Sequence, residues 1–221
     1  MTRRRRLLIA LAACGAGAVA VATALTGAAL TGAALAADRE PSALGQRVDL
    51  APLVAAWPDR YTVTGMKSEP LYTEHIEITR DADVFRVRID VLGQGDAALG
   101  TQLSAVRVRA DGTVSWLDGC AKSAELCDDD TELRGFLATA ALIGLAEQGR
   151  LPETGTARVH HGVDVVCVAD ADLHPDAAPA AVRLDPCVDR ATGAVLAHWS
   201  PDSQAFVSAT LTPGFTVEAS L

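Results

Sequence analysis

Among the residues that could do chemistry, four cysteines in the body of the chain give the clearest pattern. Their number and spacing favour disulfide bonds. The sequence holds five cysteines, and an even number remains once Cys14 is assigned to an N-terminal signal segment. An even count in an exported chain is typical of a disulfide framework. Among three connectivities we predict Cys120 with Cys127 and Cys167 with Cys187, because each pair is local and lies in or beside expected strands. Zinc is disfavoured because neither pair has the spacing of a zinc site.

Histidines and carboxylates form no comparable pattern. His160 and His161 are adjacent on an expected strand, so their side chains point to opposite faces and cannot readily chelate one ion. Asp128–Asp130 offer hard oxygen ligands but lack the spacing of a calcium loop, and they suit the start of a helix better. Asp185 and Asp189 are expected in a turn or at strand ends. The remaining histidines are isolated in the sequence: His75, His174 and His198.

The sequence also lacks the local motifs of common enzyme and cofactor sites. It contains no GxSxG nucleophile elbow, no HExxH pair and no glycine motif that cradles a phosphate between a strand and a helix. We therefore predict a non-enzymatic protein with no cofactor and no metal site.

The N-terminus predicts export. Arg3–Arg6 form a basic stretch, and the residues from Leu7 to Ala37 carry no charge. Such a start is typical of a secretory signal, and the small residues Ala34-Leu35-Ala36 fit a signal-peptidase site. We predict a signal peptide over residues 1–36, a short tether over 37–46 and one extracytoplasmic domain over 47–221.

Two alternatives for this segment stay open. The residues Leu11-Ala12-Ala13-Cys14 match a lipobox, in which Cys14 would be lipidated and the protein anchored to the membrane. The uncharged run is also long enough to serve as an uncleaved anchor. In either case the membrane is contacted through the N-terminal segment alone.

The charge of the chain excludes one class of partner. The formal net charge is −9 at pH 7, and removal of the four signal arginines makes the remainder more acidic. A protein this acidic repels nucleic acid and anionic membrane surfaces. We expect no nucleic-acid partner.

Hydrophobic alternation predicts an antiparallel meander. Phe85, Val87 and Ile89 alternate with charged residues in the clearest strand of the chain. Asp111-Gly112 is a strong hairpin signal, whereas Gly93–Gly100 is expected to be a flexible loop. The expected strands are Tyr61–Thr64, Leu71–Thr79, Val84–Val91, Val106–Arg109, Val114–Leu117, Val163–Val168, Val182–Val188, Ala194–Trp199 and Phe206–Leu211.

Two helices complete the prediction. Asp49 caps a short helix that ends at Trp57, and Thr131–Gln148 has the apolar content of a long helix buried against the concave side of the sheet. The predicted fold class is α+β: a curved, mostly antiparallel sheet packed against one main helix plus a short N-terminal helix, with two disulfides.

One stretch resembles a known superfamily. Val188-Asp189-Arg190-Ala191-Thr192-Gly193-Ala194-Val195-Leu196 is similar to a strand-turn-strand signature of periplasmic and cell-envelope lipoprotein carriers. The preceding residues, His161–Val166, look like an earlier strand of that superfamily. Its members form a half-barrel covered by helices and hold acyl chains in the apolar space between. The resemblance implies that the concave face and the main helix line an apolar site through Phe85, Val87, Ile89, Phe136, Leu137, Ile143 and Leu145.

These observations predict an exported, non-enzymatic cell-envelope protein. The resemblance implies that it binds a lipid, a lipoprotein or another apolar ligand in the concave face of the sheet. The alternative is a secreted interaction module with a solid core, which binds an envelope protein through a sheet edge or a loop.

Overall fold

A computed structural model of the chain describes residues 45–118, 131–175, 183–208 and 216–218. All of these belong to the second of the two units into which the chain divides, residues 40–221. The predictions for residues 1–36, including the lipidation of Cys14, lie outside the described residues. The same holds for Cys120, Cys127 and Asp128–Asp130.

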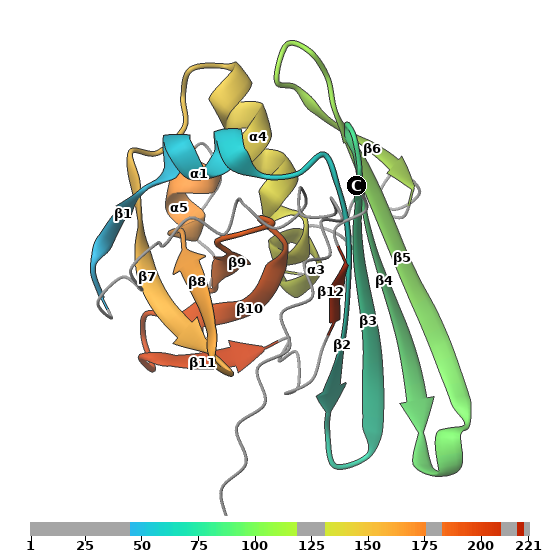
Figure 1. Cartoon of the computed structure of the whole chain (residues 1–221). Coiled ribbons are helices and arrows are strands. Elements are labelled where there is room, and N and C mark those ends of the chain that lie inside the picture. Colours follow the sequence, from blue (N-terminus) through green and yellow to red (C-terminus); the bar gives the residue numbers. More distant parts are fainter. Residues whose placement is uncertain (1–44, 119–130, 176–182, 209–215, 219–221) are drawn as a thin grey trace, which may run out of the picture. The chain divides into compact units, whose positions relative to one another are not determined.

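Antiparallel strands dominate the described residues, as predicted, but they form two six-stranded sheets instead of one (Figure 1). The first, here called the meander sheet, has the order β12-β2-β3-β4-β5-β6. The second, here called the C-terminal sheet, has the order β1-β7-β8-β9-β10-β11. Every pairing between neighbouring strands is antiparallel.

The meander sheet follows the alternation seen in the sequence. In β4, Phe85, Val87 and Ile89 are buried in the core, whereas Arg86 and Arg88 are exposed. One face of the sheet is therefore buried in the core, and the other is exposed to solvent. The strands are β2 Arg60–Ser68, β3 Tyr72–Asp81, β4 Val84–Gly93, β5 Ala98–Val108, β6 Val114–Asp118 and β12 Thr216–Glu218.

The expected loop Gly93–Gly100 is shorter than predicted. A 3-10 turn, η1 Gln94–Asp96, closes the hairpin, and β5 already begins at Ala98. Pairing across the hairpin overrides the weak strand propensity of the glycines, since Thr101 lies opposite Asp90 and its hydroxyl donates to the Asp90 carboxylate at 2.6 Å.

The C-terminal sheet contains strands that the sequence pattern did not predict. β7 runs from Thr154 to His160 and pairs with β8, while His161 and Gly162 form the connecting turn with φ values of 48° and 82°. A two-residue turn with two positive φ angles is the usual hairpin turn. The strands are β1 Arg47–Asp49, β7 Thr154–His160, β8 Val163–Cys167, β9 Asp185–Asp189, β10 Val195–Ser200 and β11 Ala205–Ser208.

The predicted long helix is broken in two. α3 Thr131–Phe136 and α4 Ala138–Glu147 are separated at Leu137, where φ is −95° and ψ is 8°. The break allows each piece to pack on its own surface: α3 contacts β9 and β10, and α4 contacts β5 and β6. A side chain at Gly135 would clash with the buried ring of His198 in β10, so glycine permits the close approach of α3.

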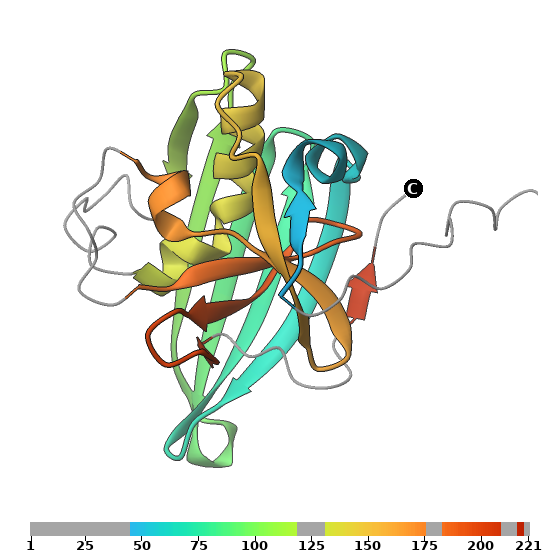
Figure 2. The same cartoon turned by 90° about the vertical axis from the view of Figure 1, so that its left-hand side faces the viewer.

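Two further helices are short. α1 Leu50–Ala56 agrees with the predicted N-terminal helix and buries Leu50 and Leu53, but Asp49 occupies the N-cap position without a side-chain capping hydrogen bond. α5 Asp170–Leu173 lies beside α4 (Figure 2). None of the helices within the described ranges has both the length and the hydropathy that a membrane crossing requires.

The Asp-x-x-Thr-Gly stretch forms the turn between β9 and β10. The Asp189 carboxylate accepts from the Thr192 backbone N–H at 3.0 Å and from its hydroxyl at 2.6 Å. Gly193 adopts φ +80°, and a side chain there would clash with the indole of Trp57. The indole N–H of Trp57 in turn donates to the Arg190 carbonyl at 3.3 Å. The turn thereby holds the end of α1 against the C-terminal sheet.

Glycines also bring the β5–β6 hairpin onto α4. A Cβ atom on Gly144 would lie 2.5 Å from the Gly112 carbonyl oxygen, and one on Gly112 would lie 2.7 Å from the Gln148 Cγ atom. Gly112 itself occupies the hairpin turn with φ +76°. The backbones of helix and hairpin therefore touch at a distance that no larger residue allows.

We expect Gly144→Ala to lower the free energy of unfolding by about 1–3 kcal/mol, because the added methyl group must push the hairpin backbone away. This loss outweighs the gain of up to about 1 kcal/mol from better helix propensity. Urea unfolding checks the value, and Gly100→Ala is the control because open space surrounds that position. Equal midpoints for the two variants would contradict the close contact.

We expect replacement of Cys167 and Cys187 by alanine to lower the free energy of unfolding by about 3 kcal/mol. The bridge closes a loop with a sequence separation of 20, and its loss restores conformational entropy to the unfolded chain. Urea unfolding without reductant measures the difference. An unchanged midpoint would show that the bridge contributes nothing to stability.

Candidate functional site

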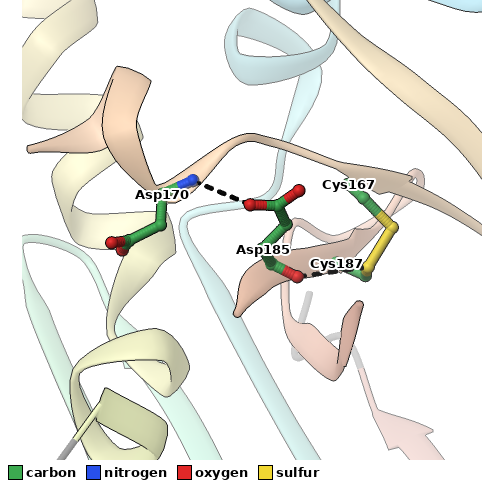
Figure 3. The surroundings of a disulfide bond; sticks show 4 residues. All are labelled: Cys167, Asp170, Asp185 and Cys187. Carbon is green, nitrogen blue, oxygen red and sulfur yellow. Dashed lines mark hydrogen bonds between the residues drawn. A yellow bond between two sulfur atoms is a disulfide. The ribbon is translucent and has the colours of Figure 1, made fainter. Parts of the chain in front are cut away.

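The predicted bridge between Cys167 and Cys187 is confirmed. The two residues are register partners on β8 and β9, and their sulfur atoms are bonded (Figure 3). Cys167 is 5% exposed and Cys187 is fully buried. Because neither sulfur is accessible, this disulfide is part of the scaffold and offers no reactive thiol.

Asp185 and Asp189 hold backbone groups. The Asp185 carboxylate accepts from the Asp170 backbone N–H at 3.1 Å, which fixes the start of α5 beside β9 (Figure 3). Burial raises the pKa of Asp185, and the hydrogen bond from Asp170 opposes that rise. Asp189 closes the β9–β10 turn described above. The two carboxylates therefore occupy the turn and strand-end positions predicted for them.

His160 and His161 do not form the pair of opposed strand residues that the sequence suggested. His160 ends β7 and is 3% exposed, while His161 lies in the turn with a positive φ. Their rings meet edge to face with centroids 4.4 Å apart, and His160 also contacts Phe206 at 4.6 Å. No group of three or more metal-binding side chains occurs in the part of the chain that the structure describes.

His198 is the most deeply buried titratable side chain of the C-terminal sheet. It has no solvent exposure, and neither ring nitrogen has a hydrogen-bond partner. The ring of Phe136 meets it edge to face at 5.3 Å, and Gly135 lies against it. Burial lowers the pKa of His198 to about 4, and the positive charge of Lys67 acts in the same direction. The neutral ring therefore serves as part of the core at pH 7.

An apolar cavity of about 350 Å³ lies elsewhere, beside α4. Its walls come from three places: the α3–α4 helices, the β5–β6 hairpin and the end of α5. Val106 on β5 reaches it from the core, and the contact between Gly112 and Gly144 joins two of its walls. The lining residues are Val106, Gly112, Thr113, Val114, Trp116, Arg134, Leu137, Ala141, Leu145, Gln148, Leu173 and His174.

Two basic side chains interrupt the apolar lining. Arg134 comes from α3, and its Nε atom is buried without a hydrogen-bond partner. His174 follows α5 and has a side chain 34% exposed. Burial lowers the pKa of His174; Asp170 at 4.0 Å opposes this effect, and the charge of Arg134 adds to it. Most of the cavity is therefore apolar, and one corner, formed by Arg134 and His174, carries the positive charge of Arg134.

The structure distributes the seven predicted lining residues over three environments. Leu137 and Leu145 line the cavity. Ile143 lines a wider, more polar hollow, together with the ring of Phe85. The others are closely packed in the core, with exposures of 5% or less: Val87, Ile89 and Phe136.

Sequence reasoning missed the contribution of Trp116, Arg134 and His174 to the cavity. Arg134 carried a signal, since it is the single charge in the apolar stretch from Leu133 to Ala146. Trp116 and His174 lie in segments far from that helix in the chain, so nothing local to either residue indicated a shared site.

Comparisons with known proteins return no relatives. No protein-family model matches the chain, and neither a curated protein nor a solved structure resembles it at a significant level.

Acid should weaken the fold through His198. The unfolded chain protonates this histidine near its ordinary pKa of about 6.5, whereas burial lowers the folded pKa to about 4. The unfolded state therefore binds more protons between these values, and up to about 3 kcal/mol of stability is lost as the pH falls from 6.5 to 4.

We expect His198→Leu to remove most of that dependence, as measured by urea unfolding at pH 7 and pH 4.5. His160 contributes to the slope of both proteins in the same direction, since its pKa is also lowered to about 4 by burial. His75→Leu, on the exposed face of β3, is the control. The assignment to His198 is wrong if both variants keep the slope of the unmodified protein.

Proposed function

We propose that this chain is an exported, non-enzymatic protein of the cell envelope that binds a small apolar ligand in the cavity beside α4. The observation that carries the proposal is the cavity itself. It has a mainly apolar lining, a few convergent polar groups and secondary structure on three sides. These are the features of small-molecule binding sites.

The volume limits the ligand. Binding pockets for small molecules usually measure about 300–1,000 Å³, and the cavity at about 350 Å³ lies at the lower end. A single short chain or a small ring system fits this space better than a lipid with two chains. Ala141 contributes to the room available, because a larger residue at that position of α4 would fill it.

The proposed location rests on the N-terminal sequence and on the disulfide. A basic start followed by an uncharged run is typical of an exported chain. A disulfide within the C-terminal sheet is consistent with folding in an oxidising compartment. The proposal retains the ligand class implied by the resemblance to lipoprotein carriers but moves the site from the packed face of the sheet to the cavity.

A second candidate function has a specific observation in its favour. Among the described strands, β6 forms one edge of the meander sheet. Its side chains Val114, Trp116 and Leu117 are 40%, 39% and 43% exposed. An edge strand with apolar side chains can accept a further strand from a partner. This arrangement supports the alternative of a protein interaction module.

We expect Ala141→Leu to weaken binding of the neutral fluorescent probe N-phenyl-1-naphthylamine at least about tenfold, or about 1.4 kcal/mol. The added side chain occupies part of the cavity, so the probe loses its space. Titration of probe fluorescence measures the dissociation constant.

The control for this experiment is Ala146→Leu. It makes the same substitution in the same helix, at a residue that does not line the cavity. Binding lost equally in both variants, or no binding by the unmodified protein, would remove the support for a ligand site and favour the interaction module.

A further inference from the structure

We infer that the ligand is an apolar acid, a single chain or ring with one carboxylate, and that Arg134 holds its anionic group. The inference rests on the proposed binding function of the cavity. It adds the chemical class of the ligand and the residue that selects it.

The first argument is the state of the Arg134 side chain. It lines the cavity, and its Nε atom is shielded from solvent without an acceptor. No ion pair joins this guanidinium to a carboxylate among the residues that the structure describes. Arg134 as a whole is half-buried, but a polar atom that is shielded from solvent, as its Nε is, normally has a hydrogen-bond partner. An anion in the cavity would supply both the acceptor and the charge.

The second argument is the position of His174. Its pKa is lowered by burial and by the charge of Arg134, so the two side chains are within electrostatic reach of one another at the same cavity. The Asp170 carboxylate lies 4.0 Å from His174 Nε2, which is too long for a hydrogen bond. An anion at this corner could therefore accept hydrogen bonds from Arg134 and from the imidazole.

The third argument concerns the charge of the ligand. One guanidinium matches one carboxylate in a two-point hydrogen-bonded pair. A phosphate ester carries about −1.5 to −2 charges at pH 7, and the excess would remain uncompensated against apolar walls. The net charge of −9 on the chain further disfavours a multiply charged anion. The corner is therefore suited to a monoanion.

The test compares decanoate with 1-decanol, which share a chain and differ in the charged group. Each displaces N-phenyl-1-naphthylamine from the unmodified protein and from Arg134→Gln, Arg134→Lys and Arg86→Gln. Arg86 is exposed on the opposite, solvent-facing side of β4, so its substitution is the matched control for the loss of one charge.

We expect the preference for decanoate over decanol to fall at least about tenfold in Arg134→Gln, because a charge-assisted pair is lost. Arg134→Lys should retain part of the preference, and Arg86→Gln should retain all of it. Decyl phosphate should bind the unmodified protein more weakly than decanoate. Circular dichroism and urea midpoints establish that each variant is folded, and Arg134→Lys provides the comparison if Arg134→Gln is not.

The outcomes separate this inference from the proposed function. If decanol binds and Ala141→Leu weakens its binding at least about tenfold, while Arg134→Gln leaves the preference unchanged, the acid is the wrong ligand class and the cavity function stands. Tighter binding of decyl phosphate than of decanoate would also overturn the choice of a carboxylate. If the unmodified protein binds neither compound, the proposed function fails and the inference fails with it.

Discussion

The hydrogen bonds of the buried Asp189 carboxylate to Thr192 are the interaction on which the packing of α1 and α4 against the C-terminal sheet depends. The carboxylate binds the Thr192 backbone and hydroxyl and so fixes the turn in which Gly193 adopts a left-handed conformation. Gly193, which has no side chain, contacts Trp57 at the end of α1. The carbonyl of Gly193 accepts a hydrogen bond from the Thr139 hydroxyl of α4. A single turn thus connects both helices to the C-terminal sheet. Burial of the carboxylate without such partners would be strongly unfavourable, so these hydrogen bonds stabilise the turn.

The position of α4 in turn determines where space remains. The break at Leu137 lets α3 lie on β10 while α4 continues along β5. Gly112 and Gly144 then bring the hairpin tip against α4. Residues of α4, the hairpin and α5 line the cavity, and α3 contributes Arg134 to it. The two halves of one apolar segment thus pack on different sheets, and both contribute residues to the cavity.

Sequence patterns predicted the parts of this fold that depend on neighbouring residues. The alternation in β4 and the valine-rich runs of β8 and β9 were sufficient to predict antiparallel pairing and one disulfide. They did not predict β7, whose glycine, alanine and arginine have weak strand propensity and which is held by pairing with β8. Division into two sheets likewise depends on contacts between distant residues.

The candidate site was less predictable for the same reason. Leu137 and Leu145 were expected in an apolar site because the resemblance to lipoprotein carriers implies that the main helix lines such a site. The break between α3 and α4 lies next to the contact of Gly135 with His198, two residues that are far apart in the sequence. Trp116 and His174 reach the cavity from separate segments, and no local pattern connects them with Arg134.

The strand order also has a consequence for the route by which the chain folds. The strands β2 to β6 are consecutive in the sequence, so each pairing closes a short loop at a small entropic cost. The C-terminal sheet instead joins Arg47 to Thr156, and β12 reaches β2 from the far end of the chain. Pairings of this kind require long loops and form slowly. A chain that emerges from its N-terminus can therefore assemble most of the meander sheet first. The cavity beside α4, which is lined by residues of β6, α4 and α5, is complete only when the second half of the chain has followed.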